Sequence, residues 1–114
     1  MFYSAGCVLS GGGKIAICAI PRSVEREIGV TEDDMDSISG LARSIEGVKM
    51  AATLREMADG RVKVSVRAVP GYDAAAVCAQ FGGGGHKGAA GATFDLPLEV
   101  AAEAVAKAMP EMEV

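Results

Sequence analysis

The sequence predicts an α/β fold, a small single domain in which a central mixed sheet is flanked by helices. The chain has 114 residues, of which 50% are hydrophobic, and this is enough for one core. A branched apolar run at residues 14–20 and a strict apolar–polar alternation at residues 61–69 indicate strands. Capping patterns at Thr31 and at Pro97 indicate helices.

The first third of the chain predicts a strand pair followed by a helix. Residues 14–20 are bounded by three glycines and by Pro21, which is typical of a buried strand, and we expect residues 2–9 to pair with it. Thr31 has an acidic residue three positions later, as in a capping box. A helix should therefore run from Thr31 to about Ser44.

The rest of the chain predicts a hairpin and two more helices. Residues 48–57 and 61–69 flank a turn at residues 58–60, and the second strand should have one polar face. Asp73 is a candidate N-cap for a helix over residues 74–81, and residues 92–94 should form a short strand. Residues 97–109 should form the last helix, so the expected order is β-α-α-β-β-α-loop-β-α.

Charge and cysteine content narrow the classes of function. A formal charge of −4 argues against a broad cationic surface for nucleic acid, so any phosphate site must be local. The three cysteines form neither a disulfide framework nor a zinc pattern, and we expect buried, reduced thiols. No apolar run approaches the ~20 residues of a membrane span, and we expect a cytoplasmic protein without a membrane partner.

The most unusual segment is a run of four glycines, residues 82–85, followed by His86 and Lys87. Consecutive glycines are costly in backbone entropy, and they are typical of positions that need positive φ or close approach of a ligand to the main chain. Free amides in such a loop can converge on an anion, with His86 and Lys87 adding donors. The alternative is a flexible loop with an exposed histidine and lysine.

Two motifs resemble the DHH-associated C-terminal domain of DHH phosphoesterases, in particular the oligoribonuclease and 3′-phosphoadenosine-5′-phosphate phosphatase type. Residues 83–91, Gly-Gly-Gly-His-Lys-Gly-Ala-Ala-Gly, resemble its G-G-G-H-x-x-A-A-G signature. Residues 64–67, Val-Ser-Val-Arg, resemble its S-[hydrophobic]-R-S strand motif, with Ala68 in place of the second serine. The resemblance implies one DHH-associated domain over residues 1–114, with its core at about 14–109.

In that family a separate N-terminal DHH domain carries the Asp-His-His motif and the metal ligands. This chain has one histidine and no such motif, so we expect it to contain no catalytic residue and no metal ligand. The resemblance implies Mn²⁺ or Mg²⁺ on that N-terminal DHH domain, which would be the partner of this chain. The chain alone should then be inactive.

The resemblance also implies a substrate, a nucleotide or a short single-stranded oligonucleotide held by its phosphate. The expected contacts are Arg67, the amides of Gly83, Gly84 and Gly85, and His86, with Ser65 and Lys87 as further candidates. Lys63 shares the polar face of its strand with Ser65 and Arg67, and for Lys63 and Ser65 an ordinary solvated edge explains the pattern as well.

Two other functions stay open at this point. One is an RNA-binding appendage like the C-terminal domain of alanyl-tRNA synthetase, which is related and also rich in glycine. The acidic balance suits it poorly, and that domain normally lacks the histidine followed by Ala-Ala-Gly. The other is a stand-alone nucleotide sensor.

Overall fold

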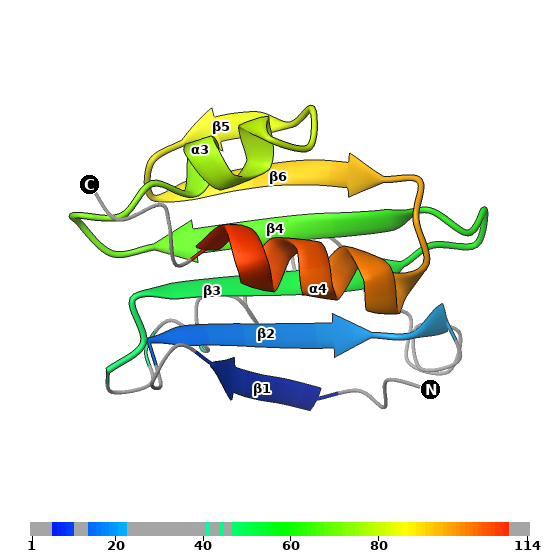
Figure 1. Ribbon diagram of the computed structural model, residues 1–114, viewed down its shortest axis with the longest axis horizontal. Coiled ribbons are helices and arrows are strands. Elements are labelled where there is room, and N and C mark those ends of the chain that lie inside the picture. Colours follow the sequence, from blue (N-terminus) through cyan, green and yellow to red (C-terminus); the bar gives the residue numbers. More distant parts are fainter. Residues whose placement is uncertain (1–5, 11–13, 23–40, 42–43, 45–46, 110–114) are drawn as a thin grey trace.

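The computed structural model describes residues 6–10, 14–22, 41, 44 and 47–109, and residues 6–10 by their backbone alone. Its centre is a six-stranded sheet with the order β1-β2-β3-β4-β6-β5 (Figure 1). β2 and β3 pair in parallel, and all other neighbours are antiparallel, which confirms the mixed sheet. The strands are β1 Gly6–Ser10, β2 Ile15–Ile20, β3 Met50–Glu56, β4 Val62–Ala68, β5 Gly84–His86 and β6 Ala89–Phe94.

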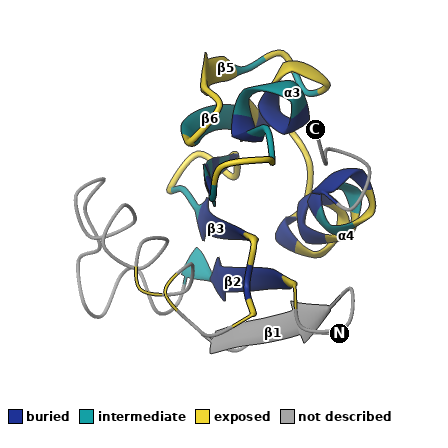
Figure 2. Ribbon diagram, turned by 90° about the vertical axis from the view of Figure 1, so that its left-hand side faces the viewer, coloured by how far each residue is buried: buried dark blue, intermediate teal, exposed yellow. Residues whose placement is uncertain are grey.

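Two helices, α3 Ala74–Ala79 and α4 Leu98–Ala108, lie on the same face of this sheet (Figures 1 and 2). Both begin where the sequence predicts. The side chain of Asp73 accepts a hydrogen bond of 3.0 Å from the amide of Ala76, as an N-cap should, and Pro97 directly precedes α4. The helix expected over residues 31–44 lies almost wholly outside the described residues.

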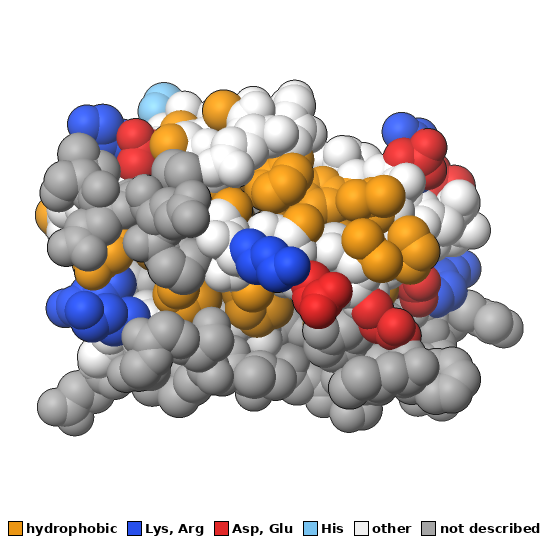
Figure 3. All heavy atoms as spheres, in the orientation of Figure 1, with side chains coloured by type: hydrophobic (Ala, Val, Ile, Leu, Met, Phe, Trp, Pro, Cys, Tyr) orange, Lys and Arg blue, Asp and Glu red, His pale blue; other side chains and the backbone are white. Residues whose placement is uncertain are grey.

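The core lies between the helices and the sheet. Alternate residues of β2, β3 and β4 point toward α3 and α4, because successive side chains of a strand face opposite sides. On the helix side, α4 contributes one apolar stripe, and Figure 3 shows hydrophobic side chains gathered on this face beside acidic ones. The largest fully buried side chains are those of Met50, Leu54, Met109, Val62, Val66, Val77 and Val105.

The predicted hairpin is confirmed at β3 and β4, with Thr53 opposite Ser65 in the register. Its turn is held by Asp59, whose carboxylate accepts hydrogen bonds from the Arg61 amide at 2.9 Å and from Arg61 Nε at 3.0 Å. These bonds lower the pKa of Asp59. Gly60 has φ of 88°, a conformation that favours glycine in this turn.

The glycine-rich segment is more ordered than the sequence predicts. Instead of a loop, Gly84–His86 form β5 at the edge of the sheet, and β5 pairs with β6 through a turn at Lys87 and Gly88. β6 is also longer than the strand expected over residues 92–94. Glycine and alanine carry no apolar alternation, so the sequence pattern could not reveal either strand.

The cysteines divide into two cases. Cys78 is free and buried, and burial raises the pKa of its thiol to about 11, as expected for an unreactive core cysteine. Cys18 is disulfide-bonded, and its Cα partner across the β1–β2 ladder is Cys7. The expectation of a reduced thiol was therefore wrong at Cys18, because sequence spacing did not show that β1 and β2 align these positions.

Within the described chain, no helix is long and apolar enough to cross a membrane.

Candidate functional site

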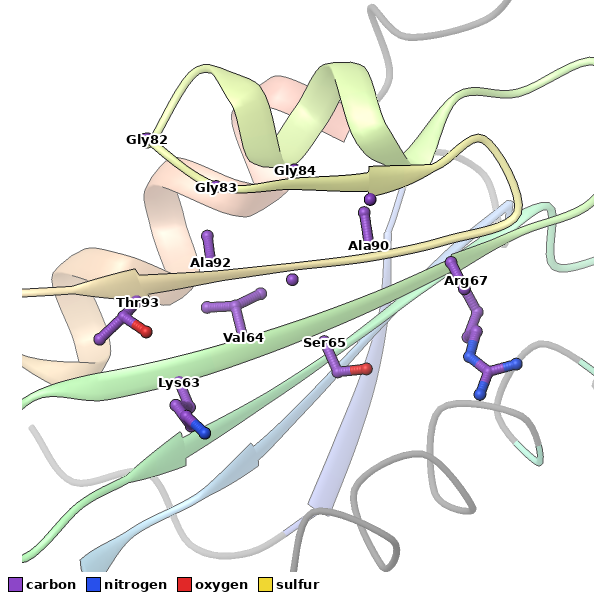
Figure 4. Close-up of a pocket in the computed structure, with 13 residues that line it drawn as sticks. Lys63, Val64, Ser65, Arg67, Gly82, Gly83, Gly84, Ala90, Ala92 and Thr93 are labelled. Atoms are coloured by element: carbon purple, nitrogen blue, oxygen red, sulfur yellow. The ribbon is translucent and has the colours of Figure 1, made fainter.

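The principal cavity of the described residues is a trough of about 660 Å³ over β4, β6 and the glycine-rich segment. Its volume is within the range of small-molecule sites. Val62, Val64 and Val66 pack into the core beneath the helices, whereas Lys63, Ser65 and Arg67 point to the other side of β4 and are half-buried (Figure 4). The trough is lined by Lys63, Val64, Ser65, Arg67, Gly82, Gly83, Gly84, Gly85, Ala89, Ala90, Gly91, Ala92 and Thr93.

The middle of the trough has almost no side chains. Ser65 is the Cα partner of Gly91, and Gly91 is the partner of Gly84, so these three residues form one row across β4, β6 and β5. Cross-strand partners in an antiparallel sheet point to the same face. The row therefore presents one small hydroxyl side chain followed by two bare stretches of backbone, which leaves room for a ligand against the main chain.

The ends of the trough are cationic. Lys63 and Arg67 are two residues from Ser65 on either side, and no aspartate or glutamate appears among the described lining residues. In a chain with a formal charge of −4, this is a local concentration of positive charge. A hollow with cations and no carboxylates attracts an anionic ligand.

The first two glycines of the run terminate α3. The amide of Gly82 donates to the carbonyl of Ala79 at 3.3 Å, and the amide of Gly83 donates to the carbonyl of Cys78 at 2.9 Å. Gly82 has φ of 79°. Together these form a Schellman-type helix end, in which glycine relieves the strain of a left-handed residue. The amide of Gly83 is thus already engaged, and it does not belong to a set of amides that converge on phosphate.

Gly83 and Gly85 also pack too tightly to carry a side chain. A Cβ atom on Gly83 would overlap the carbonyl oxygen of Gly91 and lie 2.7 Å from the Ala92 Cβ atom. A Cβ atom on Gly85, where φ is 150°, would lie 2.7 Å from the carbonyl oxygen of Ala89. Both glycines are therefore required by the close approach to β6.

Gly84 differs from its neighbours. It has no positive φ, and among the described residues nothing lies within 4 Å of the position that its Cβ would take. Neither backbone conformation nor packing of the described part explains a glycine there. Gly84 lies in the bare row of the trough, where a side chain would reduce the open space of the cavity.

His86 and Lys87 lie beyond the trough. Both are exposed, and neither lines it. His86 is in register with Ala89 and, through it, with Arg67, so it stands at the rim of the Arg67 end. Lys87 lies in the β5–β6 turn, where its carbonyl accepts a hydrogen bond of 2.8 Å from the amide of Ala74. The structure thus brings Arg67, Ser65 and the glycines together and leaves Lys87 outside.

Sequence reasoning undervalued two residues of the trough, Lys63 and Thr93. Lys63 was visible in the alternation of β4, but its location in a trough depends on the β4–β6 pairing, in which Thr93 is its partner. Across β3–β4, the partner of Lys63 is Arg55.

No cluster of three histidine, cysteine or acidic side chains suited to a metal ion is present in the described residues.

A family model described as the DHHA1 domain matches residues 9–112, nearly the whole chain. The chain belongs to this family. This confirms the resemblance to the DHH-associated domain. The trough lies where its two motifs, residues 64–67 and 83–91, occupy neighbouring strands of the sheet.

The DHHA1 domain is 39% identical over 101 residues to the bifunctional oligoribonuclease and PAP phosphatase NrnA of Thermus thermophilus. That match covers 88% of this chain and 29% of NrnA, so the chain spans less than a third of this relative.

Two solved structures share the fold. An exopolyphosphatase-related protein from Bacteroides fragilis superposes with a TM-score of 0.82 at 23% identity, over 92% of this chain and 31% of that one. The C-Ala domain of alanyl-tRNA synthetase from Aquifex aeolicus has a TM-score of 0.62 at 11% identity, over 83% of this chain and 89% of that one. At these identities the likeness concerns the fold alone.

Proposed function

We propose that this DHHA1 domain is the substrate-binding domain of a DHH phosphoesterase and holds a nucleotide or short single-stranded oligonucleotide by its phosphate. The observation that carries the proposal is the trough, in which cations at both ends flank a row of bare backbone. The identity to NrnA supports a ligand of this class.

In this proposal Arg67 provides the main phosphate contact. A guanidinium group can donate two parallel hydrogen bonds to phosphate oxygens, and its Nε atom is buried here, which limits its freedom to move. Gly84 and Gly91 allow the sugar or base to lie against the main chain, Ser65 offers a hydroxyl group, and His86 adds a donor at the rim. Lys87 would act only on a ligand that extends past the turn.

The chemical step belongs to a separate N-terminal DHH domain in this proposal. A bound Mn²⁺ or Mg²⁺ on that domain would supply activated water and stabilise charge on the phosphate. The residues of the trough would bind the ligand, orient its phosphoester bond and restrict its motion, and such positioning contributes a large part of catalysis in two-substrate reactions. A cytoplasmic location, where nucleotides occur, is part of this proposal.

A second candidate function is RNA binding of the kind an appended synthetase domain performs. The specific observation in its favour is that the fold shared with the C-Ala domain covers 89% of that domain. The negative net charge opposes it, because binding to a large RNA relies on many phosphate contacts.

Calorimetric titration of the purified chain tests the main proposal. The expected result is modest affinity for 3′-phosphoadenosine-5′-phosphate and for a dinucleotide, with no tighter binding of a transfer RNA. Affinity is modest because the second domain would hold the other side of the ligand. Tight binding of transfer RNA without nucleotide binding would favour the synthetase-like alternative.

An activity assay tests the division of labour. Release of inorganic phosphate and mononucleotide is measured with Mn²⁺ or Mg²⁺, for this chain alone and for a longer protein that includes a DHH domain. Only the longer protein should turn over, since metal-dependent hydrolysis needs several converging carboxylates and imidazoles. Metal-dependent turnover by the purified chain, lost in His86→Ala, would contradict the division.

A further inference from the structure

The trough extends beyond the reach of a single phosphate. Lys63 and Arg67 are four residues apart on β4, a separation of about 13 Å between their Cα atoms at the rise of an antiparallel strand. Both side chains line the same cavity and leave β4 on the same side (Figure 4). One phosphate bound to Arg67 therefore leaves the Lys63 end for another part of the ligand.

The Lys63 end has the chemistry of an anion site in its own right. Lys63 is in register with Thr93 on β6, which also lines the trough and adds a hydroxyl group at this end. Lys63 is half-buried, so its attraction for an anion is screened less than that of a fully exposed lysine. Phosphate accepts hydrogen bonds from both ammonium and hydroxyl groups.

We propose that Lys63 binds a second backbone phosphate and makes the trough selective for oligonucleotides over mononucleotides. This inference rests on the proposed function. A single strand offers a phosphate at each nucleotide, with a rise of ~3.4 Å along the axis of a stacked strand and a wider spacing when the strand is extended. An extended strand of three nucleotides can therefore place phosphates at both ends of the trough, with the intervening sugar and base over the bare row of Gly91 and Gly84.

Lys63 is a specificity-determining residue in this proposal, not a catalytic one. A mononucleotide meets the Arg67 end alone, so the loss of Lys63 should leave its affinity unchanged. A trinucleotide meets both ends and should lose one charge-assisted contact. The length of the ligand thus separates the contribution of Lys63 from that of Arg67.

The experiment measures the affinity of this chain for the 5′-phosphorylated RNA series pA, pApA and pApApA over a range of salt concentrations. The wild-type chain should bind pApApA about tenfold more tightly than pA, as one charge-assisted contact predicts. Lys63→Met should abolish this gain and leave pA binding within about twofold. It should also reduce the slope of log affinity against log salt for pApApA by about 0.7, the value for one phosphate contact on a single strand.

Three further variants serve as controls for this experiment. Lys107→Met removes one positive charge from the exposed surface of α4. It should change neither the gain in affinity from pA to pApApA nor the slope of log affinity against log salt. Lys63→Arg should retain the gain in affinity with ligand length and the salt dependence of the wild type. Lys63→Gln replaces Lys63→Met if circular dichroism shows that Lys63→Met does not fold.

The outcomes separate the two proposals. The role of Lys63 would be overturned if Lys63→Met still bound pApApA more tightly than pA by the wild-type factor, or if it lost affinity equally for pA and pApApA. Nucleotide binding itself would stand in either case. If the wild-type chain binds none of the three ligands, the proposed function fails and this inference fails with it.

Discussion

The two faces of β4 illustrate how one strand serves two purposes. Val62, Val64 and Val66 face the helices and are buried in the core. Lys63, Ser65 and Arg67 face the trough and are half-buried. Because neighbouring residues of a strand point to opposite sides, core packing and the lining of the trough alternate along a segment of seven residues.

The same division runs through the glycine run. Gly82, Gly83 and Gly85 are required by the end of α3 and by close packing against β6, whereas Gly84 faces open space. A change on the core side should therefore affect stability, and a change on the trough side should affect binding. Four predictions test this comparison.

The largest expected contrast is between Gly83→Ala and Gly84→Ala. The added methyl group on Gly83 would collide with β6 backbone, and we expect a loss of about 3 kcal/mol in the free energy of unfolding, as for strong overpacking. Gly84→Ala should stay within about 0.5 kcal/mol of the wild type but weaken nucleotide affinity, and more than His86→Ala does. Urea denaturation and calorimetric titration provide the two measurements. A stable, fully binding Gly84→Val variant would show that the bare row has no role in binding.

Neighbouring residues of β4 give the next contrast. Val66→Ala should lower the free energy of unfolding by about 2 kcal/mol, because Val66 is fully buried, and should leave nucleotide affinity within about twofold. Arg67→Ala should cost less stability than Val66→Ala and weaken nucleotide affinity about tenfold through the lost charge-assisted bonds. Unchanged affinity in a folded Arg67→Ala protein would remove Arg67 from the site.

A smaller effect is expected at the N-cap of α3. Asp73→Ala removes the hydrogen bond to the Ala76 amide and should lower the free energy of unfolding by about 1 kcal/mol. Asp73→Asn and Asp73→Ser retain an acceptor, and either should recover most of the loss. Since α3 covers the helix side of β5 and β6, nucleotide affinity should not change. Affinity that falls with stability would mean that the two faces are coupled through α3.

The smallest effect should come from the β3–β4 turn, which belongs to neither face. The hydrogen bonds from Arg61 lower the pKa of Asp59 in the folded protein, so the stabilisation is present above the ordinary pKa and is lost as pH falls through the lowered value. Asp59→Asn should therefore be slightly less stable than the wild type at pH 7. The difference in thermal midpoint should begin to shrink as the pH falls below about 4 and should disappear only below the lowered pKa of Asp59. A difference that persists at low pH would indicate a cause other than the charge of Asp59.

Much of the fold follows from patterns that are local in the sequence. The alternation at residues 62–66, the apolar run at residues 15–20, the Asp73 cap and the Pro97 start are all confirmed as predicted. The candidate site was only partly predictable. The resemblance pointed to Arg67 and to the glycines, but it also offered Lys87 as a further candidate and left Lys63 undecided. A motif states which residues are adjacent in the chain and not which share a cavity.

By itself the sequence determined β2, β3, β4 and the starts of α3 and α4, and which family the chain belongs to, because hydrophobic period, caps and signature residues are properties of short stretches. Only the tertiary structure decided that the glycine-rich segment is an edge strand, that Ser65, Gly91 and Gly84 form one row, and that Lys63 and Thr93 share a cavity with Arg67. These facts depend on the register between strands that are 20 or more residues apart, such as β4 and β6. Glycine and alanine provide no side-chain pattern from which that register could be inferred.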